Sequence, residues 1–224
     1  MAMRLQRWSY LAGLIGVVLF VVGAILMFDG PNGSSPAKMT AWYQSSSHRT
    51  QIHVGWILFG LGLFFFVWFV AALREQVSVY ERADGRPGSF LSGVVTIGGG
   101  AFAAAGISVA GIATGIKTMS DDTYHHEVYS GVIHGANDTT YQILVTGGGA
   151  ALAALIFAVA ATILGYGMLP RWTGWFGVVA GIAAIFSVIF FTMIVWLLWI
   201  AVASVMLFVR SRSAVGSSEP VPAV

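Results

Sequence analysis

Long apolar stretches separated by short polar segments dominate the pattern along this chain. An α-helix rises about 1.5 Å per residue, so roughly 20 apolar residues cross the ~30 Å hydrocarbon core of a bilayer. Four runs reach this length, and they cover residues 8–28, 52–73, 90–116 and 141–169. The pattern predicts one membrane-spanning helix in each run. Arg4 and Arg7 precede the first run, and we expect it to be a retained anchor and not a cleaved signal.

The next apolar stretch, residues 172–209, is too long for one straight crossing. As a single helix it would be about 55 Å long. We therefore predict two shorter spans, residues 175–188 and 193–208, joined by a tight apolar turn near residues 190–192. One long kinked helix is the alternative. The expected fold is all-α, a transmembrane bundle of six spans.

The basic residues indicate how this bundle is oriented, because cytoplasmic loops of membrane proteins are rich in Lys and Arg. With the N-terminus in the cytoplasm, the inner segments hold eight arginines: Arg4, Arg7, Arg74, Arg82, Arg86, Arg171, Arg210 and Arg212. The outer segments hold only Lys38, Arg49 and Lys117. A five-span chain would place Arg210 and Arg212 outside. The distribution therefore favours six spans with both termini in the cytoplasm.

One domain accounts for nearly the whole chain. Residues 1–210 form the predicted transmembrane domain, and residues 30–47, rich in Ser, Gly and Pro, form an outer loop. Residues 211–224 are small, polar and Pro-containing, which predicts a disordered cytoplasmic tail.

Composition agrees with this interpretation. The chain is 57% hydrophobic and 9% charged, whereas soluble domains carry about 25% charged residues. This excludes a water-soluble globule and a disordered chain. The absence of Cys excludes a disulfide scaffold and thiolate metal sites. A net charge of +2 gives no reason to expect a nucleic acid partner.

Small residues are concentrated in the spans at 90–116 and 141–169. Lipid tails give helices no hydrophobic reason to associate, so close contact through small residues supplies packing energy instead. We expect these two helices to pack tightly at the centre of the bundle. The glycines assigned to helix packing are Gly98, Gly99, Gly100, Gly111, Gly115, Gly147, Gly148, Gly149, Gly177 and Gly181. Alternatively, the two glycine triplets are broken-helix ligand sites of a transporter, within an inverted repeat of residues 96–106 and 145–155.

Ionisable residues are missing from the predicted spans, apart from His53 and Lys117 at outer edges. Proton relays and ion pathways usually need such groups at depth, and bis-His haem ligation needs histidines there. The chain also contains no G-x-S-x-G hydrolase motif. We predict no catalytic residue and no cofactor-binding residue.

The outer loop at 121–138 is the one place where metal chemistry is conceivable. Imidazole and carboxylate groups suit Zn²⁺ or Cu²⁺, and the candidate ligands are His125, His126, His134 and Asp138. In a helix, His134 and Asp138 would lie one turn apart on the same face. No HExxH motif is present. The alternatives are a pH-sensitive or partner-binding loop, or a polar loop that only stays out of lipid.

Three stretches carry a resemblance to a known family. They are residues 69–74, followed by Glu81 and Gly85, residues 91–100, and a Leu-Pro-x-Trp-x-Gly-Trp junction at 169–175. In these stretches, across the middle two-thirds of the chain, it resembles a family of uncharacterised bacterial membrane proteins with about six spans. The resemblance implies a multi-pass protein of the bacterial cytoplasmic membrane. It implies no activity and no functional residue.

The resulting hypothesis is a non-enzymatic accessory or structural subunit of a larger membrane complex. Its expected partners are membrane lipids and either another membrane protein or further copies of the chain. Two alternatives remain open. One is a small transporter or a protein that binds lipid or an apolar solute. The other is an outer-face metal-binding protein that uses the loop at 121–138.

Overall fold

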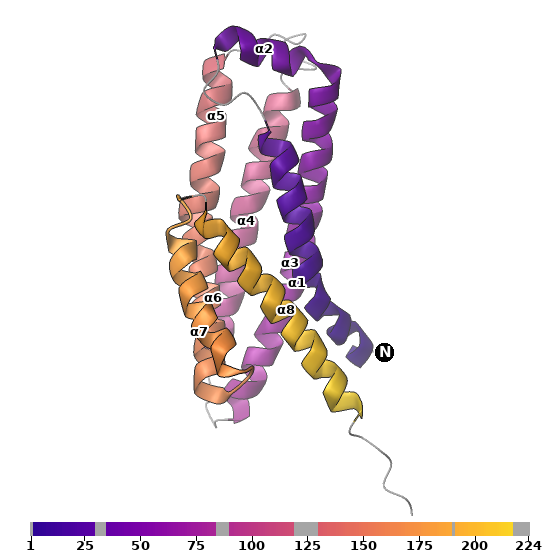
Figure 1. Ribbon diagram of the computed structural model, residues 1–224, viewed down its shortest axis with the longest axis vertical. Helices are drawn as coiled ribbons and strands as arrows, with labels where there is room; N and C mark the ends of the chain where they lie inside the picture. The colour runs from indigo at the N-terminus through magenta and orange to yellow at the C-terminus, as the bar shows by residue number, and fades with distance from the viewer. Residues whose placement is uncertain (1, 30–34, 84–89, 119–129, 190, 217–224) are drawn as a thin grey trace, which may run out of the picture.

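The computed structural model describes residues 2–29, 35–83, 90–118, 130–189 and 191–216. Every regular element in these ranges is helical, which confirms the all-α prediction (Figure 1). The elements are α1 (Ala2–Phe28), α2 (Pro36–Gln44), α3 (Ser46–Ala83), α4 (Phe90–Thr118), α5 (Ser130–Gln142), the π-helical turn η2 (Ile143–Gly148), α6 (Gly149–Tyr166), α7 (Arg171–Ile185) and α8 (Thr192–Gly216).

Five helical segments in the described ranges are long and apolar enough to cross a membrane. They are Trp8–Phe28, Ser46–Ala83, Phe90–Gly115, Gly131–Tyr166 and Thr192–Ser211. Each contains or overlaps a predicted span, and α6 ends at Tyr166, before the predicted end at residue 169. The remaining predicted span, residues 175–188, falls on α7, which has 15 residues. At about 22 Å this helix is shorter than the hydrocarbon core.

A turn separates α7 from α8, so the alternative of one long kinked helix is wrong. The turn includes residues 186–189 and 191 and begins earlier than predicted. It is held by backbone hydrogen bonds from Ile189 to Phe186 and from Thr192 to Ile189, each 2.9 Å. The hydroxyl of Thr192 also donates to the carbonyl of Ile189 at 2.7 Å.

The helices form a bundle in which neighbours along the chain are mostly neighbours in space. α1 packs on α3, α3 on α4, α4 on α6 and α6 on α7, and α8 returns to pack on α7 and α1. Figure 1 shows α8 crossing the bundle obliquely and α2 lying across the end opposite the N-terminus. Aromatic side chains fill the centre. The ring of Phe102 lies 5.1 Å from that of Phe66, 5.8 Å from Trp196 and 6.2 Å from Phe20, centroid to centroid.

Glycines let α1 and α3 approach very closely. A Cβ placed on Gly23 would lie 2.7 Å from the carbonyl oxygen of Gly55, and one on Gly62 would lie 3.0 Å from that of Gly16. In each helix the two glycines are seven residues apart, or about two turns, so they share one face. Close backbone contact through such residues stabilises helix pairs in membranes.

The beginning of α1 and the end of α8 lie at the same end of the bundle (Figure 1). The ring of Trp8 is 6.0 Å from that of Phe208. The backbone N–H of Leu14 donates to the hydroxyl of Ser204 at 3.0 Å, and that hydroxyl donates to the carbonyl of Tyr10. The bundle therefore brings α1 and α8 into contact, although the bonded residues are almost 200 positions apart in the sequence.

Several helices are longer than the apolar runs that predict them. α3 extends beyond 52–73 at both ends, and α5 begins at Ser130, well before residue 141. α8 continues to Gly216, through the first six residues of the predicted disordered tail. The predicted outer loop 30–47 contains α2, whose first residue is Pro36. Backbone hydrogen bonds continue a helix into water after the apolar run ends, so hydrophobicity alone does not mark its end.

Candidate functional site

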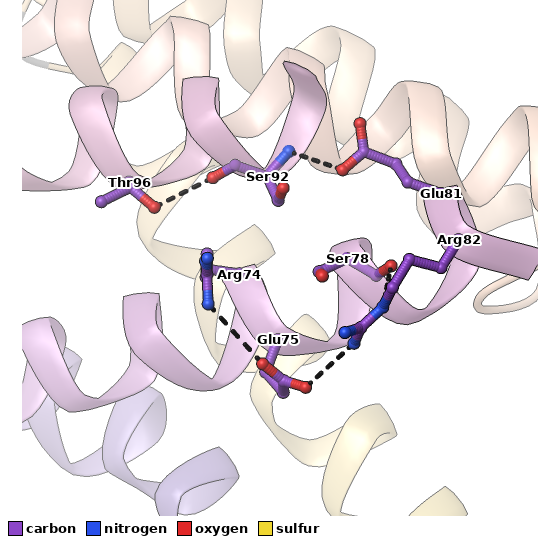
Figure 2. Close-up of polar contacts among 7 residues, drawn as sticks. All are labelled: Arg74, Glu75, Ser78, Glu81, Arg82, Ser92 and Thr96. Atoms are coloured by element: carbon purple, nitrogen blue, oxygen red, sulfur yellow. Dashed lines mark hydrogen bonds and ion pairs between the residues drawn. The ribbon is translucent and has the colours of Figure 1, made fainter. Parts of the chain in front are cut away.

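At one end of the bundle, Glu81 joins α3 to the start of α4 (Figure 2). This side chain is 4% exposed, and its carboxylate accepts the backbone N–H groups of Leu91 at 2.7 Å and Ser92 at 3.1 Å. The first N–H groups of a helix have no acceptor within the helix, and a negative charge there is favourable. Glu81 is therefore a capping residue.

The other polar residues at this end also stabilise helices. Glu75 lies 3.3 Å from Arg82 and 3.7 Å from Arg74, in half-exposed ion pairs (Figure 2). On α8, Arg210 donates to the carbonyls of Gly167, at 3.4 Å, and Met168. Gly167 ends α6 with a left-handed φ of 68°. These contacts fix helix ends.

At the opposite end, α2 is held across α3 and α5. The imidazole of His48 stacks on the indole of Trp42, with centroids 4.5 Å apart, and its Nδ1 is 3.0 Å from the Trp42 carbonyl. Arg49 donates to the carbonyl of Tyr43 at 2.9 Å. Tyr43 is buried against Ile52 and Ile133, and burial raises the pKa of its phenol.

The structure tests the proposed metal ligands only in part. His134 and Asp138 lie on α5, one turn apart as predicted, and His125 and His126 lie outside the described residues. Among the side chains that are described, no three His, Cys, Asp or Glu come close enough to hold a metal ion together. Zinc or copper binding at this loop therefore stays a prediction.

The predicted packing glycines divide into two groups. Those at helix contacts within the chain are Gly98, Gly99, Gly148, Gly149, Gly177 and Gly181. A Cβ on the remaining four, which are Gly100, Gly111, Gly115 and Gly147, would meet nothing within 4 Å. Within the described part of the chain these four glycines make no close helix contact, and the packing role predicted for them stays a prediction. Successive helical residues point about 100° apart, so the members of a glycine triplet cannot all face one neighbour.

α4 and α6 are in direct contact. A Cβ on Gly98 would lie 2.6 Å from the carbonyl oxygen of Ala151, and one on Gly148 would lie 3.4 Å from the ring of Phe102. The transporter hypothesis required a continuous cavity between these helices. A narrow apolar crevice does occur elsewhere, between α1, α3, α4 and α8, where Phe20, Phe102 and Trp196 line it.

No family model matches the chain, and neither curated proteins nor solved structures provide a significant match. The family resemblance therefore stays a prediction from three short stretches. The geometry of the chain itself has to carry the functional argument.

The outer surfaces of α4 and α6 differ from those of the other helices. Their exposed positions are mostly small, interrupted by Phe90, Ile97 and Ile107 on α4. We call the following residues the small-residue face: Gly100, Ala101, Ala104, Ser108 and Gly111 on α4, Gly147 on η2, and Ala150 and Ala154 on α6. The exposed surfaces of α1, α3 and α7 carry large apolar side chains, including Val18, Val22, Ile25, Ile57, Leu61, Phe64, Val179, Ile182 and Ile185.

Two exposed polar residues lie beside the small-residue face, where α5 passes through η2 into α6. The hydroxyl of Thr146 donates to Oε1 of Gln142 at 3.0 Å. Turns of π-helix inside longer helices are frequent at functional sites. The hydrophobic pattern did not single out Gln142, although a carboxamide near the start of the 32-residue uncharged run 139–170 is itself a signal.

Proposed function

We propose that the protein is a six-span membrane protein with cytoplasmic termini that acts without enzymatic activity, as a subunit of a larger membrane assembly. The observation that carries this proposal is the small-residue face. Glycine and alanine there give no advantage in packing against lipid chains, whereas they let the backbone of another helix approach closely. The resemblance noted in the sequence points to the bacterial cytoplasmic membrane.

Six spans agree with the position of the chain ends. Trp8 and Phe208 are in contact, which supports both ends lying on one side and an even number of crossings. Five long helices and α7 satisfy this condition if α7 is a short crossing, with the bilayer thinned or the helices tilted around it. Arg74, Arg82 and Arg210 come to the same end as Trp8, which favours a cytoplasmic location for that end.

The packing between α4 and α6 favours association over transport. A path for a solute between them would have to separate Gly98 from Ala151. Several buried hydroxyls bond to backbone carbonyls, as Thr162 does to Ala158 at 2.9 Å and as Ser204 does to Tyr10. Such hydroxyls are already satisfied and are poor candidates for a solute path.

Purification in native lipid particles tests the proposal, with mass spectrometry and metal analysis of the same sample. We expect the chain to be recovered in a stoichiometric complex. The double variant Gly100→Leu, Ala104→Leu should release it, because bulky side chains would fill the small-residue face. Ala71→Leu adds the same bulk to an exposed position of α3 and should leave the complex intact.

A chain that is monomeric in native lipid particles and in several mild detergents would contradict the proposal. Stoichiometric zinc or copper in a monomeric sample would instead favour the metal-binding alternative.

A further inference from the structure

We propose that a second copy of this chain covers the small-residue face and that the two copies meet at Gln142. This inference rests on the proposed function and names the partner. It begins from the chemistry of one exposed side chain and not from the small residues alone.

Gln142 lies within the helical segment Gly131–Tyr166, which is long and apolar enough to cross a membrane. Gly148 packs on Phe102, and the ring of Phe102 is 6.2 Å from that of Phe20 on α1. Gln142 is six residues from Gly148, or about 9 Å along the helix. α1 continues from Phe20 to Phe28, about 12 Å in the same direction. The carboxamide therefore lies within the depth that α1 crosses.

A carboxamide that faces hydrocarbon at this depth is costly unless it finds a hydrogen-bond partner. Its Oε1 accepts the hydroxyl of Thr146, and its amide nitrogen carries two donors. Ser108 on α4 is exposed at nearly the same depth, with its hydroxyl donating to the carbonyl of Ala104 at 3.0 Å. A partner that covers this surface should therefore present polar atoms at the depth of Gln142 and Ser108.

A second copy meets this requirement without further assumptions. Two copies with the same orientation in a membrane are related by a two-fold axis along the bilayer normal, so a residue near the axis meets its own counterpart. A carboxamide is both donor and acceptor, and two of them pair with each other. Gly147, Ala150 and Ala154 continue the strip and allow the backbones to approach.

The charge at the outer end limits where the copies touch. Asp138 is exposed one turn before Gln142 on α5, and two such carboxylates on the axis would repel each other. The contact therefore runs from Gln142 inward along α6, and the two α5 helices diverge.

Cysteine cross-linking tests this arrangement directly, because the chain has no native Cys. We would place single cysteines in the full-length chain by Gln142→Cys and Ala150→Cys, the second of which keeps the carboxamide. The control is Ile182→Cys on α7, where Ile182 is 47% exposed. In phosphatidylcholine vesicles at low protein density, mild oxidation should join the first two variants into dimers at least tenfold more than the control. Equal yields at all three positions would overturn the proposal.

The contribution of the carboxamide to dimer stability is measured from the monomer–dimer equilibrium. Labelled chains are counted by single-molecule photobleaching in the same vesicles. Interhelical polar contacts in membranes contribute about 0.6–1.7 kcal/mol. Gln142→Leu should therefore raise the dimer dissociation constant about 3- to 20-fold, and Ile182→Leu should not change it. A wild-type chain that is monomeric at every density, or an unchanged constant for Gln142→Leu, would overturn the proposal.

A photo-cross-linking residue at position 142 in native membranes separates this inference from the proposed function. An adduct of twice the chain mass supports both. An adduct with a different protein, with a monomeric chain in vesicles, overturns the second copy and leaves the proposed function standing. Monomers without adducts in either setting overturn both.

Discussion

The carboxylate of Glu81 accepts a hydrogen bond of 2.7 Å from the backbone N–H of Leu91, which ties the last turn of α3 to the first turn of α4. A second bond, from the N–H of Ser92, uses the other carboxylate oxygen. Both N–H groups would lack a partner if this side chain were removed, and the site is buried. The contact therefore affects stability more than the exposed ion pairs around Glu75 do.

Replacing this cap should destabilise the bundle measurably. Glu81→Ala should lower the free energy of unfolding by about 1–3 kcal/mol, because it leaves buried donors unsatisfied. Glu81→Gln should cost less, because one acceptor oxygen remains. Glu75→Gln on the same helix is the control and should change stability by less than about 1 kcal/mol. Reversible unfolding in detergent micelles measures all three, and equal losses for Glu81→Ala and Glu75→Gln would contradict the assignment.

The glycine contact between α1 and α3 should tolerate no added methyl group. A Cβ at position 23 would press on the backbone of α3, which cannot move aside as a side chain can. Gly23→Ala should therefore destabilise the protein by about 1–3 kcal/mol or more. Gly60→Ala, where a Cβ meets nothing within 4 Å, should be neutral or stabilising. Thermal unfolding of the pair in one detergent provides the comparison, and similar midpoints would refute it.

Gly167 should be needed for its conformation. Its φ of 68° lies in the left-handed region that ends helices. Gly167→Ala should cost about 1 kcal/mol, although no neighbouring atom would clash with the new Cβ. Gly165→Ala lies two residues earlier, within α6 and in open space, where alanine is the better helix former. Gly167→Ala should therefore lower the free energy of unfolding and Gly165→Ala should raise it, as measured by denaturant unfolding in mixed micelles.

The phenol of Tyr43 should resist ionisation. Burial raises its pKa above the ordinary value of 10.0, so the folded state favours the protonated form. The packing of α2 is then fully stable below pH 10 and weakens as the pH rises through the raised pKa. The absorbance of phenolate, taken as wild type minus Tyr43→Phe, should show one group that titrates above 10.0. Titration of that group at or below 10.0 would argue against a buried phenol.

The sequence predicted the helices better than their ends or their faces. Apolar runs located the long helices, and the uncharged stretch after residue 171 correctly indicated two helices. Helix ends depend on local hydrogen bonds, such as that from Arg82 to the carbonyl of Ser78 at 3.2 Å, which a count of apolar residues does not detect. The start of α2 was in principle readable, because Pro36 at the first helical position is a known signal.

The packing surfaces were harder to predict. Clustered glycines attracted attention to α4 and α6, yet Gly100 and Gly147 face outward. A Cβ on Gly23 would lie only 2.3 Å from the backbone nitrogen of Phe59, in the contact between α1 and α3. The signal for this contact was a spacing of seven between Gly16 and Gly23 and again between Gly55 and Gly62. Spacing within a helix fixes which face a residue occupies, whereas only the folded bundle decides whether that face meets another helix.

The hydrogen bond from Leu14 to Ser204 has a consequence for biogenesis. Chains are synthesised from the N-terminus, so α1 enters the membrane long before the helix that completes its surroundings has been made. Until then Phe20 and Phe102 lack the indole of Trp196. A nascent chain interrupted before α8 would therefore lack the helix that packs on both α1 and α7.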